Sequence, residues 1–444
     1  MTKYIVNDTE LISVADTIRT KGNTSTQLEW PIGYIEAINN FQISDSDNEI
    51  EEKIITRTIS NYTNEKIKFI GSYAFAMCTN LTNVDFPICT TIGSDAFYNC
   101  SNLTTINFPA CTTIGGSAFF NCCYNLTTAS FPACTTIGDS AFYNCSSLTT
   151  TNFPVCTTIG ARAFESCSNL TTANFPMCTT VGNGAFYNCY NLTTANFPKC
   201  TTIDNYAFYT CCYNLTTASF TKCTTIGINA FSTCYSLITA NFPVCTTINS
   251  GAFYNCSSLT TINFPMCTTI GSRAFDSCSS LTAINFPVCT TIGSSAFHYC
   301  SILTTISFPA CTTIGSSAFD NCYELTTVNF PACTTINNYA FNFCFSLTTV
   351  NFPVCKTISG SFNFGRCYRL LSAYFLGSSV PKLTSSNAFY STPIAGYTTS
   401  TEGILGSIFV RASLLTQFKS AVNWSYFSSR IVGLTDKEIA ALNI

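Results

Sequence analysis

Cysteine is the residue type in this chain with the greatest capacity for chemistry. The 444 residues include 29 cysteines, which recur every 22 or 23 residues in two separate series. Thiols at fixed spacing can form disulfide bonds, bind zinc or lie buried as small apolar groups. No Cys-x-x-Cys pair occurs, and the number of cysteines is odd. We therefore expect no metal site and a ladder of buried free thiols, with disulfide bonds between the two series as the alternative.

Acid–base catalysis would have to use His298, the only histidine in the chain. It has no partner close by in sequence. Asp276 and Asp320 occupy the same place two repeats apart, and coil spacing puts them roughly 10 Å from each other. This arrangement is more typical of a surface than of a tuned pair of carboxyl groups. The sequence predicts a protein that is not an enzyme and needs no cofactor.

One position of the repeat, the eighteenth, varies more than the others and is rich in tyrosine. Tyrosine gives stiff, amphipathic contact area with a hydroxyl group, as binding surfaces favour. The nineteenth position is usually asparagine, and the two rows together would suit a glycan or a protein surface. The alternative is that the rings only cover the turns beneath them. The predicted binding residues are Tyr98, Tyr143, Tyr187, Tyr209, Tyr254 and His298.

A unit of 22 or 23 residues positions these side chains and repeats about 13 times. In one copy, Leu103, Ile106 and Phe108 take the first, fourth and sixth positions, which predicts a strand that buries alternate residues. The outward residues, Thr105 and Asn107, begin rows of small hydrogen-bonding groups. One unit cannot bury its own apolar residues, so the copies must stack around a continuous core. The fold class that we predict is a β-rich solenoid, capped at both ends.

The second half of the unit predicts another short strand and a turn. Ile114 ends the extended piece, and Gly115 is expected to take a positive φ at a corner. A short helical or 3₁₀ turn is expected from Ala118 to the second cysteine of the unit. Asn249 and Asn337 replace the corner glycine in two units, and asparagine tolerates a positive φ better than other non-glycine residues.

The unit resembles the BspA-like, or treponemal, class of leucine-rich repeats. The pattern that carries the resemblance is L-x-x-[IVA]-x-F-P-x-C-x-x-I-G-x-x-A-F-x-x-C, and it covers residues 67–376. Departures are few, such as Thr221 for the usual proline and Val181 for the usual isoleucine. The resemblance implies a right-handed leucine-rich-repeat coil with short strands and short turns.

Composition argues against two kinds of partner. Charged residues are 9% of the chain and the net charge is −3, with no basic run to neutralise the phosphates of a nucleic acid. No stretch of about 18 or more apolar residues occurs, so we expect no membrane insertion. The first eight residues lack the apolar centre of a Sec signal peptide. We therefore expect synthesis in the cytoplasm and, if the chain reaches an exterior, another route.

The two ends differ from the repeat. Residues 1–42 carry two short helical patterns, and residues 43–66 combine an acidic linker with an alternating strand at Lys53–Ile59. Residues 377–444 lose the cysteines and predict a C-terminal cap.

Three segments, Tyr4–Asn7, Leu11–Gly22 and Trp30–Ile38, resemble leader domains on tail-associated and prophage-encoded proteins of Gram-positive bacteria. This resemblance implies that residues 1–42 fix the chain to other virion or surface-assembly proteins. The alternative is a simple cap over the apolar end of the stack.

Two functions from different classes are consistent with these features. In the first, the chain is an adhesion or receptor-binding module on a phage tail or bacterial surface, and it recognises a cell-surface glycan or protein through exposed repeat positions. In the second, it is a structural spacer or assembly component whose length matters more than its surface.

Overall fold

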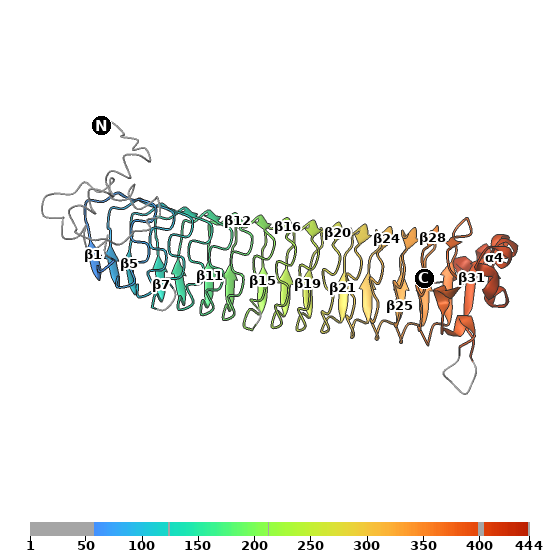
Figure 1. The fold of residues 1–444 in the computed structure, drawn as a ribbon. Helices are drawn as coiled ribbons and strands as arrows, with labels where there is room; N and C mark the ends of the chain where they lie inside the picture. The colour runs from blue at the N-terminus through green and yellow to red at the C-terminus, as the bar shows by residue number, and fades with distance from the viewer. Residues whose placement is uncertain (1–56, 123–124, 212, 398–403, 443–444) are drawn as a thin grey trace, which may run out of the picture.

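The structure is a computed structural model that describes residues 57–122, 125–211, 213–397 and 404–442. They form one elongated parallel β-solenoid of about 17 turns, which confirms the predicted fold class (Figure 1). The predicted leader, residues 1–42, and the acidic linker lie outside the described residues. Of the strand expected at Lys53–Ile59, the described part, 57–59, is not in a strand, and the first strand lies at Asn61–Thr63.

The first strand of each coil forms at the third to fifth positions of the unit. Its middle residue points inward, as in Ala129, which is 1% exposed between the exposed residues Thr128 and Ser130. Neighbouring strands pair in parallel with a register of one coil, for example Thr172 with Thr194. The strands of this series are β1 Asn61–Thr63, β3 Asn83–Asp85, β5 Thr105–Asn107, β7 Thr128–Ser130, β9 Thr150–Asn152, β11 Thr172–Asn174, β13 Thr194–Asn196, β15 Thr217–Ser219, β17 Thr239–Asn241, β19 Thr261–Asn263, β21 Ala283–Asn285, β23 Thr305–Ser307, β25 Thr327–Asn329, β27 Thr349–Asn351 and β29 Ser372–Phe375.

The second strand of each coil is two residues long, yet these strands build one continuous parallel sheet of 15 strands along the rod (Figure 1). Each places a buried aliphatic residue on the equivalent residue of the next coil, as Ile114 does on Ile92 and Ile137. The strands are β2 Phe69–Ile70, β4 Thr91–Ile92, β6 Thr113–Ile114, β8 Thr136–Ile137, β10 Thr158–Ile159, β12 Thr180–Val181, β14 Thr202–Ile203, β16 Thr225–Ile226, β18 Thr247–Ile248, β20 Thr269–Ile270, β22 Thr291–Ile292, β24 Thr313–Ile314, β26 Thr335–Ile336, β28 Thr357–Ile358 and β30 Lys382–Leu383.

The predicted short turn of each coil consists of single hydrogen-bonded turns rather than a continuous helix. The N–H groups of Phe120 and Cys122 donate within the coil, to the carbonyl groups of Ser117 and Phe119. The N–H groups of Ser117, Phe119 and Asn121 instead donate to the following coil. A helix cannot continue through this segment because Ser117 and Asn121 have φ angles of 52° and 57°. The turn segments therefore add a third set of hydrogen bonds along the rod.

The prediction that the corner glycine takes a positive φ is wrong. Gly115 does not have one, but a Cβ atom on it would lie 2.6 Å from the carbonyl carbon of Gly93 in the preceding coil. Glycine fits this corner most easily because the backbone of the preceding coil approaches it closely. Asn249 and Asn337, which replace this glycine, do not have positive φ either. Their amide groups donate to Ile226 O and, at the second site, to the equivalent carbonyl, both at 2.9 Å.

Asparagine at the nineteenth position has a backbone role. This position carries a positive φ, and asparagine adopts that conformation more readily than other residues with a Cβ atom. The φ angles lie between 55° and 60° for Asn99, Asn121, Asn144, Asn188 and Asn255. The frequency of asparagine beside the tyrosine row therefore follows from backbone geometry and does not require a ligand.

Substitutions at Asn255 should separate backbone geometry from side-chain contacts. We expect Asn255→Gly to change the free energy of unfolding by no more than about 0.5 kcal/mol, because glycine adopts a positive φ freely. Asn255→Val should lower it by roughly 1–3 kcal/mol, because a β-branched side chain is strained at this φ of 58°. Urea denaturation followed by circular dichroism measures both values. Equal losses in the two variants would contradict the backbone role.

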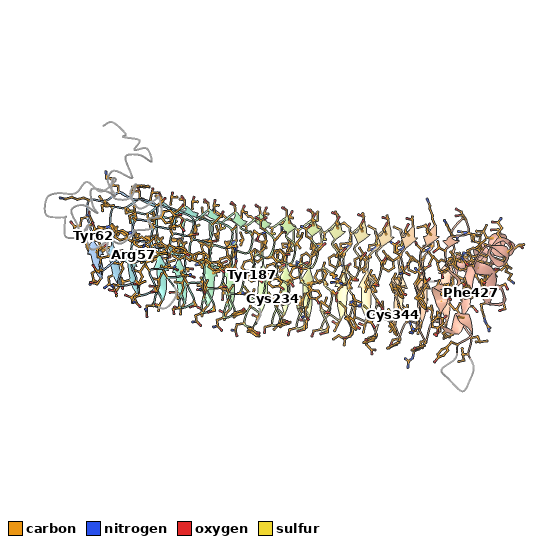
Figure 2. The ribbon with its side chains drawn as sticks, viewed as in Figure 1. Arg57, Tyr62, Tyr187, Cys234, Cys344 and Phe427 are labelled. Atoms are coloured by element: carbon orange, nitrogen blue, oxygen red, sulfur yellow. The ribbon has the colours of Figure 1, made fainter. Side chains whose placement is uncertain are left out.

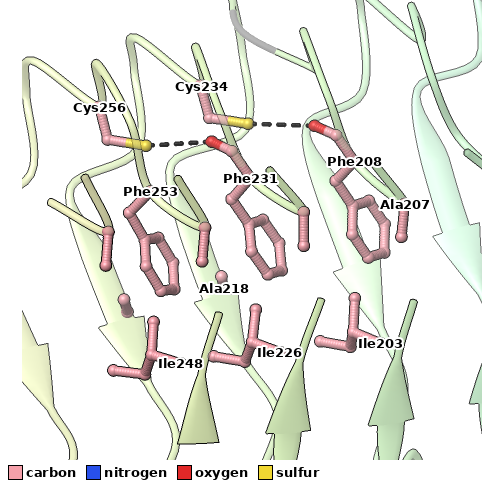
Figure 3. Packing of buried hydrophobic residues seen from close by; sticks show 14 of the residues in the cluster. Ile203, Ala207, Phe208, Ala218, Ile226, Phe231, Cys234, Ile248, Phe253 and Cys256 are labelled. Carbon is pink, nitrogen blue, oxygen red and sulfur yellow. Dashed lines mark hydrogen bonds between the residues drawn. The ribbon is translucent and has the colours of Figure 1, made fainter. Parts of the chain in front are cut away.

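Two columns of phenylalanine form the centre of the core, and Figure 3 shows part of one of them, with Phe208, Phe231 and Phe253. Phe231 and Phe253 of neighbouring coils stack with ring centroids 5.3 Å apart and an interplanar angle of 3°. Phe242, from the sixth position of the unit, meets Phe231 edge-on at 5.9 Å and 68°. All three rings are buried. Stacked and edge-on contacts are the favourable aromatic geometries, so each coil adds two rings to a continuous aromatic column.

The described cysteines are free and buried, as the sequence predicts. In the first series each thiol donates to the carbonyl two residues later, as Cys245 does to Thr247 O at 3.3 Å. In the second series, from Cys100 onward, the described thiols donate to a phenylalanine carbonyl of the preceding coil, and Cys256 Sγ lies 3.1 Å from Phe231 O (Figure 3). Burial raises the pKa of the Cys245 thiol to about 12. The thiols therefore act as neutral hydrogen-bond donors inside the core.

The described part of residues 377–444 closes the C-terminal end of the rod, where Figure 2 labels Phe427. Strand β31 pairs with β29 and with β32, so the last coils continue the first series of strands. Trp424 is fully buried, and its Nε1 donates to Pro381 O at 2.7 Å. The elements are η1 Ser386–Phe389, η2 Pro393–Ala395, β31 Ser407–Arg411, η3 Ala412–Leu414, α4 Leu415–Ser420, η4 Trp424–Arg430, β32 Ile431–Leu434 and α5 Asp436–Ala440.

Candidate functional site

The predicted tyrosine row lies on the turn side of the rod, and its rings are half-buried, including Tyr187 near the middle (Figure 2). Tyr98 stacks on Phe120 with centroids 5.1 Å apart, and Phe120 stacks on Tyr143 at 4.5 Å. Tyr187 stacks on Tyr209 at 5.0 Å. Each inner ring is therefore covered on its faces by its neighbours and presents an edge to solvent.

The row is divided into separate segments. The guanidinium of Arg162 lies 5.1 Å from the centroid of the Tyr143 ring and pairs with Glu165 at 2.6 Å. This charged pair separates the first stack from the Tyr187–Tyr209 pair. The buried Ser232 follows that pair, and Tyr254 comes next. The structure thus brings together Tyr98 with Tyr143 and Tyr187 with Tyr209, but it leaves Tyr254 apart.

His298, which has no partner close in sequence, lies between two carboxylates in the structure. Its Nδ1 is 3.2 Å from Asp276 Oδ1, and its Nε2 is 4.0 Å from Asp320 Oδ2. Burial raises the pKa of the Asp320 carboxyl group above its ordinary value, while the amide hydrogen bond from Asn342 opposes this rise. Ser277 Oγ donates to Asp276 at 2.9 Å instead of facing the ring. The group is a polar ladder that positions the imidazole ring.

No metal centre is formed in the described part of the chain. Among those residues, no three histidine, cysteine, aspartate or glutamate side chains gather as a metal site would require.

The outward row on the first strand series is also organised as a ladder. Asn196 Nδ2 donates to Asn174 Oδ1 at 2.7 Å, and Asn263 donates to Asn241 at 2.8 Å. The amide groups therefore satisfy one another along the rod and leave part of their hydrogen-bonding capacity toward solvent. This face is polar, flat and nearly uniform from coil to coil.

A second aromatic row, which sequence reasoning missed, lies toward the C-terminal end of the rod, where the residue after the second cysteine of the unit is aromatic in consecutive coils. Tyr323 stacks on Phe345 at 5.1 Å, Phe345 on Tyr368 at 5.3 Å, and Tyr368 meets Tyr397 at 5.4 Å. Phe345 is 36% exposed and Tyr397 is 45% exposed. The sequence signal for this row is the recurrence of aromatic residues at this position, as in Tyr190, Tyr235 and Tyr323.

The guanidinium group of Arg366 adds a positive charge beside this second aromatic row. Arg366 lies 4.7 Å from the centroid of the Phe343 ring and 5.5 Å from that of Tyr390. Phe343 in turn meets Phe345 edge-on at 5.9 Å, so the two groups are continuous. We call Tyr323, Phe345, Tyr368, Tyr397 and Arg366 the C-terminal aromatic patch.

The chain belongs to the BspA type leucine rich repeat family. The family's leucine rich repeat region, which contains six copies of the repeat, matches this chain at residues 56–171, 157–282 and 290–416. Among the described residues, no helix combines the length and the apolar character that crossing a bilayer demands. No curated protein matches the chain.

Solved structures of bacterial leucine-rich repeat proteins are similar to the chain. One from Bacteroides ovatus ATCC 8483 is 22% identical, with a TM-score of 0.52 over 74% of this chain and 85% of that one. A leucine rich cell surface protein from Faecalibacterium prausnitzii A2-165 is 27% identical, with a TM-score of 0.39 over 72% of this chain and 84% of that one. The first of these similarities supports the leucine-rich-repeat fold.

Proposed function

We propose that the chain is a non-catalytic recognition module that binds a partner through the turn side of the rod. The observation that carries this proposal is the C-terminal aromatic patch, where Phe345 and Tyr397 stay 36% and 45% exposed although they belong to a stack. Aromatic residues and arginine are enriched at the centres of protein interfaces. The near-identical interior of the coils leaves only such outer rows to distinguish one partner from another.

A protein surface fits the patch better than a glycan, the other predicted ligand. A sugar ring packs on the open face of an aromatic ring. Within the patch, Phe345 has Tyr323 on one face and Tyr368 on the other, so it offers an edge. Ring edges and tyrosine hydroxyl groups suit the mixed apolar and polar surface of a protein.

The setting that we propose is a bacterial surface or a phage tail. The resemblance of residues 1–42 to leader domains of tail-associated proteins supports attachment to other virion or surface-assembly proteins. In that arrangement the rod would hold the patch away from its attachment point.

Binding to bacterial cells tests the proposal. The fluorescently labelled chain is titrated onto a panel of intact Gram-positive and Gram-negative cells, and the triple variant Tyr323→Ser, Phe345→Ser, Tyr368→Ser is compared with it. Serine stands at this position in other coils, such as Ser257, so the fold should persist. We expect the apparent affinity to fall at least about tenfold, because exposed aromatic side chains carry much of the energy of such interfaces.

The matched control replaces Val244, Met266 and Val288, exposed apolar residues of another row, with serine and should bind as the parent does. A second variant, Tyr143→Ala, Tyr187→Ala, Tyr209→Ala, measures the contribution of the predicted tyrosine row. Protease treatment of the cells should abolish binding, whereas periodate sensitivity would indicate a glycan. Unchanged binding by the patch variant would contradict the proposal.

The second candidate function is a structural spacer. The continuous 15-stranded sheet favours it, because such a sheet makes a stiff rod of defined length. Failure to bind any cell, together with copurification with structural proteins through residues 1–42, would favour the spacer.

A further inference from the structure

A pocket lies at the C-terminal end of the rod, away from the aromatic patch. Its floor is formed by the ends of β25 and β27, and its walls by the segment after β29, by Arg411 and by residues at and after helix α5. Its volume is about 590 Å³, within the range of sites that hold small molecules. The repeat alone does not create this pocket, because the aperiodic C-terminal segment supplies Ser378, Ile439 and Leu442.

Asn351 supplies a buried acceptor that lacks a partner. The residue lines the pocket and is 5% exposed, whereas Asn152 and Asn196, at the same position of other coils, are exposed. Its Nδ2 donates to Asn329 Oδ1 at 3.1 Å. Its Oδ1 accepts no hydrogen bond from any described residue. A buried acceptor without a donor is costly, so a ligand with a hydroxyl or N–H group would be stabilised here.

Lys356 supplies a positive charge at the rim. The equivalent position of other coils holds threonine, for example Thr334, whose hydroxyl donates to the preceding coil. Lys356 is exposed, and in the described part of the chain no carboxylate lies within ion-pairing distance of it. Arg411, the other cation in the lining, is already bound to Asp436 at 2.6 Å and to Leu376 O at 2.8 Å. One unneutralised cation therefore faces the pocket.

The remaining lining is mixed, since Asn329, Ser378 and Ser379 add polar groups beside an apolar part. Pro331 and Pro353 contribute ring surfaces from the floor, and Leu376 and Ile439 contribute aliphatic side chains from the walls. A ligand that matches all three features has an apolar C–H surface, hydroxyl donors and one negative charge. A purely apolar ligand would leave Asn351 Oδ1 unpaired, and a neutral one would leave Lys356 without a partner.

We propose that this pocket binds a saccharide unit that bears a carboxylate, such as a uronic or sialic acid. Its C–H face packs on the prolines, a hydroxyl donates to Asn351 Oδ1, and the carboxylate pairs with Lys356. This site goes beyond the proposed recognition surface and uses none of its residues.

Calorimetric titration of the full chain tests the pocket. The probes are D-glucuronic acid, D-galacturonic acid and N-acetylneuraminic acid, with D-glucose, D-galactose and N-acetylmannosamine as neutral counterparts and acetate as a bare carboxylate. At least one acidic sugar should bind about tenfold more tightly than its neutral counterpart and than acetate. The proposal is wrong if no acidic sugar binds with a dissociation constant below about 10 mM, or if acetate binds equally well.

Two variants assign the binding to residues. Lys356→Thr restores the residue found in other coils and should lower the affinity for the acidic sugar about tenfold without changing that for the neutral one. Asn351→Ser introduces the residue that stands at this position in another coil, Ser307. This variant should bind both the acidic and the neutral sugar more weakly. The control Asn263→Ser, in the middle of the rod, should change neither. Binding unaltered by Lys356→Thr would overturn the proposal, and loss of cell binding by the patch variant would leave it untouched.

Discussion

Raising the pH above about 9 should unfold the rod at room temperature, although a reducing agent is present throughout. The cause is the buried thiols. Burial raises the pKa of Cys156 to about 11 and that of Cys111 to about 12, against about 8.5 for a cysteine in an unfolded chain. Between these values the unfolded chain releases thiol protons that the folded chain retains. The contribution of each thiol to stability is fully present below about pH 8.5 and is lost as the pH rises toward the folded pKa.

The expected size of this effect is large because the repeat multiplies it. Each thiol lowers the free energy of unfolding by about 1.4 kcal/mol per pH unit within this window. A typical coil carries two, so it loses about 3 kcal/mol per pH unit. At roughly 0.1 kcal/mol per residue, a coil of 22 residues is stable by only about 2 kcal/mol. Stability should therefore vanish within about one pH unit above pH 8.5.

Urea denaturation at pH 7, 8, 8.5 and 9, followed by circular dichroism, measures the slope of the free energy of unfolding against pH. The control variant replaces Cys245, Cys267 and Cys289, one thiol in each of three consecutive coils, with alanine. Between pH 8.5 and 9, where the unfolded thiols are only partly ionised, its slope should be smaller by about 2–3 kcal/mol per pH unit. A slope that is the same in both proteins would show that other groups cause the alkaline transition.

Phe253→Ala should lower the free energy of unfolding by about 3–5 kcal/mol. The ring is fully buried and stacks between Phe231 and Phe275 with centroids 5.3 Å and 5.2 Å away. Phe242 and Phe264 meet it edge-on at 5.9 Å and 5.8 Å. The substitution therefore leaves a cavity that reaches the two neighbouring coils.

The Phe253→Ala substitution should also change the cooperativity of unfolding. Repeat proteins are held together by nearest-neighbour contacts, so a weak coil in the middle uncouples the two arms of the rod. Urea denaturation should show a lower midpoint and a broader or divided transition. Tyr254→Ser, at the adjacent residue where another coil carries Ser232, should cost less than about 1 kcal/mol. Equal losses in the two variants would contradict the continuous aromatic core.

The sequence was sufficient to predict the solenoid and its interior. A period of 22 residues with apolar residues at fixed places leaves stacking as the way to bury them, and Phe108 and Cys111 follow from it. It also predicted the free thiols. The sequence did not predict the backbone geometry of the corner correctly. Glycine permits both a positive φ and a close approach of two backbones, and the residue type of Gly115 alone does not tell which of the two occurs.

For the candidate site, the repeat determined which residues share a row, and the tertiary structure decided how they face one another. The equal spacing of Asp276, His298 and Asp320 predicts that they follow one another along one row, but only the folded structure shows the imidazole between the two carboxylates. The pocket at Asn351 depends on a C-terminal segment that folds back onto the coils. That segment is not periodic, so its long-range packing has no counterpart in the repeat. Local periodic contacts are encoded in the spacing of the residues, whereas aperiodic contacts are determined only when the whole chain has folded.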